Sequence, residues 1–245
     1  MQKPTTGPRL RNAALGRNLT HGMLDSLGRA IVTGSYDDTA FPTEAELAKQ
    51  HGVSRSVTRE AVKMLTAKGL VSARPRQGTI IQPASAWNLF DADVLRWLLE
   101  RKFSFDLLRQ FNELRIAIEP QAAVLAAMRA TAEDHRAIDA GLARMVAAEN
   151  GQDDPLAADI AFHVAILHAT GNPFYIQFRD LVETALRTSI RFTNRIKGRT
   201  ASIEDHSAVR DAILRGDAEV ARTAMRHLIG EVLQLIDRGE GELAA

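Results

Sequence analysis

A carboxylate and two imidazoles stand at spacings that could bring them onto one metal ion. Asp159 and His163 are four residues apart in a helical pattern, so they share one helix face. His206 opens a later helical segment, EDHSAVRDAILRGD. This donor set suits a divalent ion of the Zn, Ni or Mn type. Spacing alone equally fits ordinary surface or core residues. A metal with an open position could also activate water, which keeps a metal-dependent enzyme as an alternative, although no general base or nucleophile adjoins the set.

A second group of residues is suited to DNA. Arg55 and Arg59 are four apart, near the start of a predicted helix that begins at Ser54. Arginines at this place in a reading helix can hydrogen-bond guanine O6 and N7. Ser54 and Ser56 could reach phosphates. The alternative is a solvated basic face, but a tight glycine turn before the helix and a basic hairpin after it favour DNA binding.

The segment after this helix changes from a helical to a strand pattern. Leu70-Val71 and Thr79-Ile80-Ile81 are β-formers around a loop that contains Pro75, so we expect a β-hairpin. Its tip would offer basic and amide side chains and a glycine that allows close approach to DNA: Arg74, Arg76, Gln77 and Gly78.

Arg115 borders the apolar stripe of a predicted helix over 104–129. It lies four residues after Phe111 and three before Ile118, at the edge of the inward-facing apolar residues. A buried guanidinium needs an anionic partner. Glu119, four residues on, could serve, or Arg115 could grip the carboxylate of a ligand. Both interpretations stay open at this point.

Composition and charge bound the kind of protein. The chain has 245 residues, 45% hydrophobic and 25% charged, and no cysteine, which suits a packed protein in a reducing cytoplasm. No apolar run approaches the length of a membrane span. Residues 1–83 contain 12 Lys and Arg against 6 Asp and Glu, whereas residues 84–245 contain 19 against 24. A basic first part joined to an acidic second part indicates that only the first meets a polyanion.

The predicted elements are mainly α-helical. Residues 1–18 are expected to form a flexible tail, and residues 19–83 a winged helix-turn-helix of three helices and a hairpin. Residues 84–102 are expected to form a linker helix, and residues 103–240 an all-α antiparallel bundle. Within the last two segments the pattern predicts helices near 91–100, 104–129, 132–149, 154–169, 173–196, 202–215 and 217–238. Pro120 is expected to kink the second of these.

The segment FPTEAELAKQHGVSRSVTREAVKMLTAKGLVSARPRQGTII resembles the winged helix of GntR-family bacterial transcription regulators. The resemblance implies DNA contacts at Ser54, Arg55, Ser56, Arg59 and Gly78. Two residues depart from the family pattern. Phe41 replaces the usual leucine, and Ala45 stands where many members place an arginine that reads the operator.

The segments ELRIAIEPQAAVLAAMRATAEDH, DIAFHVAILHATGNP and EDHSAVRDAILRGDAEVARTAM resemble the FCD effector domain of the FadR subgroup of this family. The resemblance implies a metal site at Asp159, His163 and His206, and an effector-pocket role for Arg115. The family's fourth ligand, a histidine, falls on Leu228 here. His227 is one residue early, about 100° around the helix, and is a candidate fourth ligand.

These patterns predict a cytoplasmic, homodimeric transcription regulator, most simply a repressor. Its partners would be a double-stranded DNA operator and a small carboxylate effector, such as a sugar acid, bound near a divalent metal ion. A dimer is expected because one reading helix covers only half of a two-fold operator. The alternatives are a constitutive dimeric DNA-binding protein without an effector and the metal-dependent enzyme already named.

Overall fold

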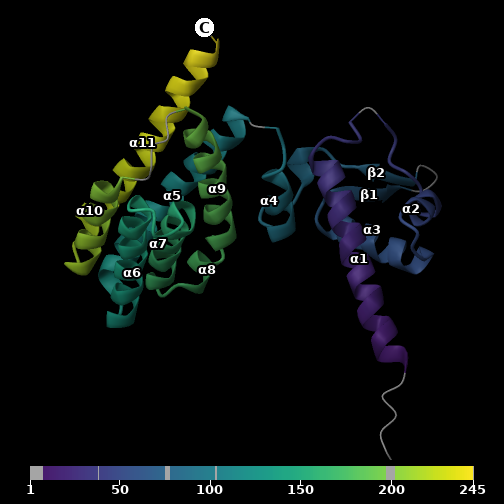
Figure 1. The fold of residues 1–245 in the computed structure, drawn as a ribbon, viewed down its shortest axis with the longest axis horizontal. Coiled ribbons are helices and arrows are strands. Elements are labelled where there is room, and N and C mark those ends of the chain that lie inside the picture. Colours follow the sequence, from purple (N-terminus) through teal and green to yellow (C-terminus); the bar gives the residue numbers. More distant parts are fainter. Residues whose placement is uncertain (1–7, 38, 75–77, 103, 197–201, 245) are drawn as a thin grey trace, which may run out of the picture. The chain divides into compact units, whose positions relative to one another are not determined.

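The computed structural model describes the backbone of residues 8–37, 39–74, 78–102, 104–196 and 202–244, with side chains described within 18–189 and 202–240. The chain divides into two compact units, Met1–Lys102 and Phe103–Ala245 (Figure 1). Its described residues are mainly helical, as predicted, and carry a single two-stranded sheet. No helix among them has the length and apolar character needed to cross a membrane.

The first unit is built from three helices, a hairpin and a short fourth helix. In chain order these are α1 (Pro8–Val32), α2 (Glu44–Gln50), α3 (Arg55–Ala67), β1 (Val71–Arg74), β2 (Gly78–Ile81), a 3-10 turn (Ala84–Ala86) and α4 (Ala92–Leu98). Helix α3 packs against both α1 and α2. Helix α3 and its neighbours together supply a core of fully buried leucines: Leu27, Leu47, Leu65 and Leu70.

Local signals place the ends of α2 and α3 where the sequence predicts them. Thr43 and Glu46 form the expected capping box, with the Thr43 amide donating to Glu46 Oε2 at 2.8 Å. Ser54 caps α3 by accepting a hydrogen bond from the Val57 amide. Gly52, in the turn between the two helices, has a φ of +63°, which glycine adopts most easily.

The expected hairpin is confirmed. Strands β1 and β2 pair antiparallel, with Val71 opposite Ile81 and Arg74 opposite Gly78. Gly69, just before β1, has a φ of +75°, and a Cβ there would lie 2.2 Å from the carbonyl oxygen of Ala86. Glycine therefore lets the chain that leaves the hairpin pass closely behind α3.

Helix α1 is longer than the sequence predicts. It begins at Pro8, whereas a flexible tail was expected over 1–18. Proline is favoured in the first turn of a helix, and the following run Ala13-Ala14-Leu15 consists of strong helix formers. The helix consequently extends ahead of the residues that pack against α3.

Helix α4 belongs to the first unit, whereas a separate linker was expected over 84–102. Trp97 is fully buried, and a Cβ added at Gly28 of α1 would lie 2.2 Å from its ring. The indole Nε1 of Trp97 also donates to Asp25 Oδ1 at 2.8 Å. The tryptophan therefore fixes α4 onto α1.

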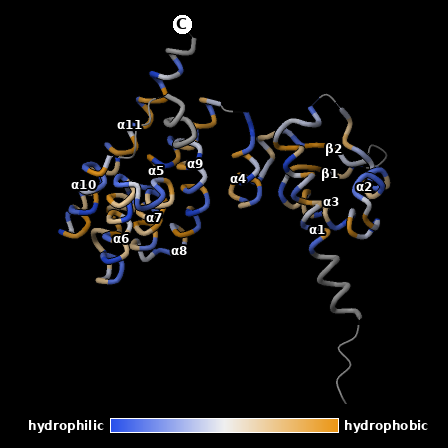
Figure 2. Tube along the Cα trace, in the orientation of Figure 1, coloured by the Kyte–Doolittle hydropathy of each residue, from blue (hydrophilic) through white to orange (hydrophobic). Residues whose placement is uncertain are grey.

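The second unit is an all-helical bundle, as predicted. It contains α5 (Phe105–Arg129), α6 (Ala132–Glu149), α7 (Pro155–Ala169), α8 (Pro173–Ile176), α9 (Arg179–Ile196), α10 (Ile203–Leu214) and α11 (Ala218–Ala244). Helix α5 is central, because α7, α9, α10 and α11 all pack against it. Apolar and polar residues alternate along these helices (Figure 2). The inward residues include Ala122, Ile138, Phe162, Ile166, Val182, Val209, Met225 and Ile229.

Two helices of this unit differ from the prediction. The single helix expected over 173–196 is divided into α8 and α9, because Tyr175 and Phe178 both pack against the core across the break. Helix α11 runs to Ala244 rather than ending near 238. Arg109 of α5 pairs with Asp237 at 3.1 Å and with Glu240 at 2.5 Å, which supports the added turns. Pro120 lies inside α5, which continues past it.

Candidate DNA interface and candidate metal and effector site

Helix α3 has one buried face and one polar, exposed face. Thr58, Ala61, Val62 and Leu65 are buried against the rest of the first unit. The predicted contact residues are all on the exposed side: Ser54, Arg55, Ser56 and Arg59. Because this polar face forms no part of the core, its side chains are free to be used for recognition.

The exposed side chains at the start of α3 have local partners on the surface of the first unit. The Ser54 and Ser56 hydroxyls lie 2.8 Å apart. Arg59 Nε lies 3.6 Å from Glu44 Oε2, and 65% of the Arg59 side chain is exposed. Such an exposed pair contributes little to stability and is easily exchanged for a phosphate or base. Ala45, beside Glu44 at the start of α2, is exposed and offers no hydrogen-bonding group.

The hairpin tip is described only in part. Gly78 has a φ of +79°, with no atom within 4 Å of a Cβ built on it, so the backbone there is open to a partner. Arg74, at the end of β1, is exposed. The predicted contacts Arg76 and Gln77 lie outside the described residues.

The three predicted metal ligands of the second unit come together. Asp159 and His163 lie on α7 and His206 on α10, and all three are buried. One ligand atom from each lies within 4.8 Å of the others. His206 Nε2 is 3.0 Å from Asp159 Oδ1, and His163 Nε2 is 3.5 Å from the same oxygen. The Nε2 atoms of both rings therefore face the Asp159 carboxylate.

Both histidines are oriented through their other ring nitrogen. His206 Nδ1 lies 2.7 Å from the Ser202 carbonyl oxygen, to which it donates. His163 Nδ1 pairs with the carboxylate of Glu119. Partners of this kind fix the tautomer that leaves Nε2 free as a metal ligand. From its spacing, Glu119 was expected only as a partner for Arg115, and its contact with His163 was not predicted.

The buried charges of this cluster strongly affect one another. Burial alone would lower the pKa of His163, but the Glu119 and Asp159 carboxylates overcome this and raise it to about 9. Burial likewise opposes ionisation of Glu119, but Arg115 and His163 hold its pKa at about 2. The Asp159 pKa is also lowered, because hydrogen bonds from the two histidines outweigh burial. Both carboxylates are therefore ionised at neutral pH.

Arg115 lies beside this cluster and is only 2% exposed. Its Nε donates to Glu119 Oε1 at 2.6 Å, so the ion pair considered from the sequence is present. Among the residues whose side chains the structure describes, its two terminal nitrogens have only long contacts of 3.4 Å, from Nη1 to Asn112 Oδ1 and from Nη2 to His163 Nε2. The described residues therefore satisfy the donors at the outer edge of the guanidinium only through these long contacts.

The prediction of His227 as a fourth ligand is wrong. Its side chain is 61% exposed, and its Nε2 lies 3.7 Å from Asp205 Oδ1 rather than near the buried cluster. Leu228, the next residue, is the one that turns inward and is 7% exposed. A single-residue offset on a helix was enough to place the imidazole on the outside.

Comparison with known proteins assigns both units. Residues 22–81 match the model for bacterial regulatory proteins of the gntR family, and residues 110–231 match the model of the FCD domain. The chain belongs to the GntR family. The match of both domains also places it in the FadR-type subgroup, and dimerisation is general in this family.

Full-length relatives agree with the GntR assignment. The uncharacterized HTH-type transcriptional regulator YieP of Escherichia coli K12 is 35% identical over 88% of this chain and 94% of its own length. The galactonate operon transcriptional repressor of the same organism is 32% identical over 86% and 94%. The solved structure of E. coli McbR/YncC shares the fold, with a TM-score of 0.51, 17% identity and coverage of 91% and 98%. This GntR-family protein is a DNA-binding transcription regulator, not an enzyme.

The buried cluster fits the metal that FCD domains typically bind in their effector site. It offers two imidazole nitrogens and one carboxylate oxygen, and both histidines have the outer hydrogen-bond partners that metal-binding histidines require. The described residues supply three protein ligands, so the other coordination positions of a bound metal ion would be open to water or a small molecule.

Proposed function

We propose that this protein is a dimeric repressor released or retained at its operator by a small carboxylate bound in the FCD domain. The observation that carries the proposal is the position of Arg115. Its guanidinium is buried, has only 3.4 Å contacts at its outer edge among the described residues, and contacts the candidate metal ligand His163. An arginine in this setting suits a carboxylate, which accepts two parallel hydrogen bonds from the guanidinium.

The charge balance of the site supports an anionic effector. Arg115, Glu119 and Asp159 together carry one net negative charge when both histidines are neutral. A divalent ion would reverse this to one net positive charge. Because an uncompensated charge is costly in a buried site, a monoanionic carboxylate would be the favoured occupant.

A 2-hydroxy acid is the carboxylate class we favour. The names of two relatives refer to a galactonate operon and to an L-lactate dehydrogenase operon, and galactonate and lactate both carry a hydroxyl beside the carboxylate. A metal ion bound by Asp159, His163 and His206 would supply a Lewis-acid site for ligand oxygens. Arg115 would orient the carboxylate, and Glu119 would hold both Arg115 and His163 in place.

For DNA, we propose that Ser54, Arg55, Ser56, Arg59, Gly78, Arg76 and Gln77 contact the operator. Two copies would place their α3 helices about 34 Å apart, one turn of the duplex. The effector would act by binding two arrangements of the dimer unequally, because a ligand shifts an equilibrium only through differential affinity. The repressor name of the galactonate relative supports the sign of regulation.

A thermal-shift experiment tests the effector site. Wild-type protein, loaded with Zn²⁺, Ni²⁺ or Mn²⁺ or treated with chelator, would be screened against galactonate, L-lactate and related acids. We expect at least one acid to raise the melting temperature of the metal-loaded protein. Arg115→Lys, which keeps the charge but loses the planar fork, should lose that shift while still being stabilised by metal. Arg144→Lys, at a partly exposed pair with Asp153, is the matched control.

The outcomes separate the two parts of the proposal. No shift from any acid with any metal would contradict the carboxylate site. A shift that survives unchanged in Arg115→Lys would remove Arg115 from the effector contact. Absence of metal from protein purified without chelator, together with no stabilisation by added metal, would remove the metal.

A further inference from the structure

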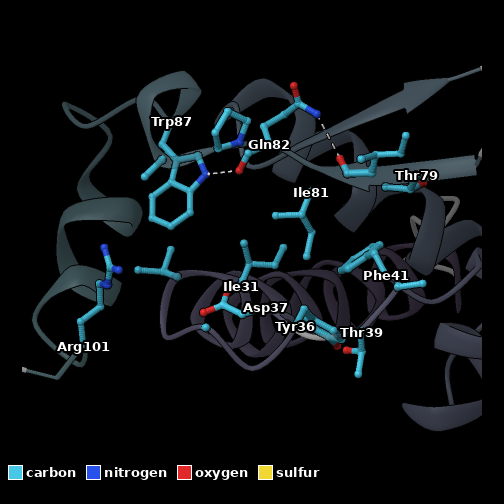
Figure 3. Close-up of a pocket in the computed structure, with 16 residues that line it drawn as sticks. Ile31, Tyr36, Asp37, Thr39, Phe41, Thr79, Ile81, Gln82, Trp87 and Arg101 are labelled. Atoms are coloured by element: carbon cyan, nitrogen blue, oxygen red, sulfur yellow. Dashed lines mark hydrogen bonds between the residues drawn. The ribbon is translucent and has the colours of Figure 1, made fainter.

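The first unit contains a pocket that neither DNA reading nor the buried cluster explains. It has a volume of about 540 Å³ and lies between the end of α1, the loop that follows it, strand β2 and the segment around Trp87 (Figure 3). This size is within the range of small-molecule sites. All its lining residues belong to the first unit, so the pocket is distinct from the FCD effector site.

Aromatic rings line the two ends of the pocket and are held in place. The Nε1 of Trp87 donates to the Gln82 carbonyl oxygen at 2.9 Å, which fixes the indole at one end. Tyr36 and Phe41 meet edge to face at the other end, with ring centroids 5.2 Å apart (Figure 3). Gln82 is itself anchored by a 2.7 Å hydrogen bond to Ser72 Oγ. Rigid, flat walls of this kind favour a planar ring over a flexible polar chain.

The pocket also contains charged and polar groups that the described part of the chain does not satisfy. The Arg101 guanidinium lies 5.9 Å from the Trp87 ring centroid, and no ion pair with it occurs among the described residues. Asp37 and Tyr36 likewise have side-chain oxygens without a hydrogen-bond partner in that part of the chain. Burial raises the pKa of Tyr36, so its hydroxyl remains a neutral donor.

We propose that this pocket binds a planar aromatic carboxylate. The ring would occupy the space between Trp87 and the Tyr36–Phe41 pair, and the carboxylate would pair with Arg101, the exposed cation beside the Trp87 ring. A hydroxyl at the far end of the ligand would meet Tyr36. The ligand would also contact Ile81 of β2, the strand that leads from the hairpin tip, so it would bind at the base of the wing.

Fluorescence anisotropy with 6-hydroxy-2-naphthoate tests this site in the full-length protein. The probe has a carboxylate and a hydroxyl at opposite ends of a planar double ring. We expect saturable binding by wild-type protein and roughly tenfold weaker binding by Arg101→Gln, the usual scale for losing one charged hydrogen bond. Lys102→Gln, which removes the adjacent exposed cation outside the lining, should bind like wild type. The neutral analogue 2-naphthol should bind wild type and Arg101→Gln with the same affinity.

Several results would overturn the proposal. One is the absence of saturable binding in the millimolar range by a wild-type protein with normal circular dichroism. Another is equal affinity of wild type and Arg101→Gln. Loss of binding in Arg115→Lys but not in Arg101→Gln would show that the probe occupies the FCD site. A change of oligomeric state in Arg101→Gln, without probe binding to wild type, would assign the pocket to a second copy of the chain.

Discussion

The two candidate sites of this protein are built in opposite ways. The residues of α3 that are proposed to contact DNA are exposed, and Arg59 has a loose pair with Glu44 at 3.6 Å. The residues proposed to bind the effector and metal are buried, and Glu119 joins Arg115 on its own helix to His163 on another. Recognition of DNA can thus change without disturbing the fold, whereas each residue of the sensing site is also part of the bundle's structure.

The largest expected effect lies in the buried network. Glu119→Gln leaves Arg115 buried without its anion, so we expect a loss of about 3–5 kcal/mol in the free energy of unfolding. Glu183→Gln breaks a partly exposed pair with Arg187 on the surface of α9 and should cost less than about 0.5 kcal/mol. Urea unfolding followed by circular dichroism measures both. Similar small losses for the two variants would show that the buried network is not structurally coupled.

A substitution in α1 tests the packing of the first unit. Gly28→Ala would place a Cβ 2.2 Å from the Trp97 ring and should cost about 1–3 kcal/mol through overpacking. Gly22→Ala, in the same helix, meets nothing within 4 Å and should stabilise by about 0.5–1 kcal/mol, because alanine favours helix. Opposite signs in thermal unfolding support the attachment of α4 to α1. Two stabilised variants would contradict it.

The exposed site should respond in binding rather than in stability. Arg55→Ala and Arg59→Ala should each weaken operator binding by about 1–3 kcal/mol, with unfolding free energies within about 0.5 kcal/mol of wild type. Arg187→Ala in the second unit is the control for a general loss of positive charge. Gel-shift titrations on a defined operator would exclude a base-reading role if the affinities of the α3 variants matched the control.

The smallest effect is expected at Ala45. Because Ala45 is exposed beside Glu44, Ala45→Arg should leave stability unchanged and add one cation near the DNA. If that cation reaches a phosphate, the slope of log affinity against log salt should become steeper by about one. An unchanged slope would mean that the start of α2 does not approach the duplex.

Features that depend on contacts between residues close in the sequence could be predicted, whereas features that depend on long-range packing could not. The capping residues Thr43, Ser54 and Thr131 act within three or four residues, and the helices they begin were predicted correctly. The break after α8 depends on tertiary packing of Tyr175 and Phe178, and no glycine or proline marks it.

The proposed effector and metal site was likewise predicted only where its residues are close in the sequence. The Asp159 and His163 pair could be found by spacing, but the contact between His163 and Glu119 spans 44 residues and required the fold. The prediction for His227 was wrong because this residue lies one position before the family's ligand position, which turns its side chain to the outside of the helix. No pattern in the sequence near Trp97 predicted that it packs onto Gly28 of α1.

The most direct test of the account is operator affinity measured by fluorescence anisotropy across a panel of 2-hydroxy acids, with and without divalent metal. We predict that at least one acid changes the affinity of metal-loaded wild-type protein by about fivefold or more, the usual scale of allosteric coupling. The change should disappear after chelation and in Arg115→Lys. The same operator affinity under all these conditions, in protein that binds its operator, would contradict control of α3 through the buried site.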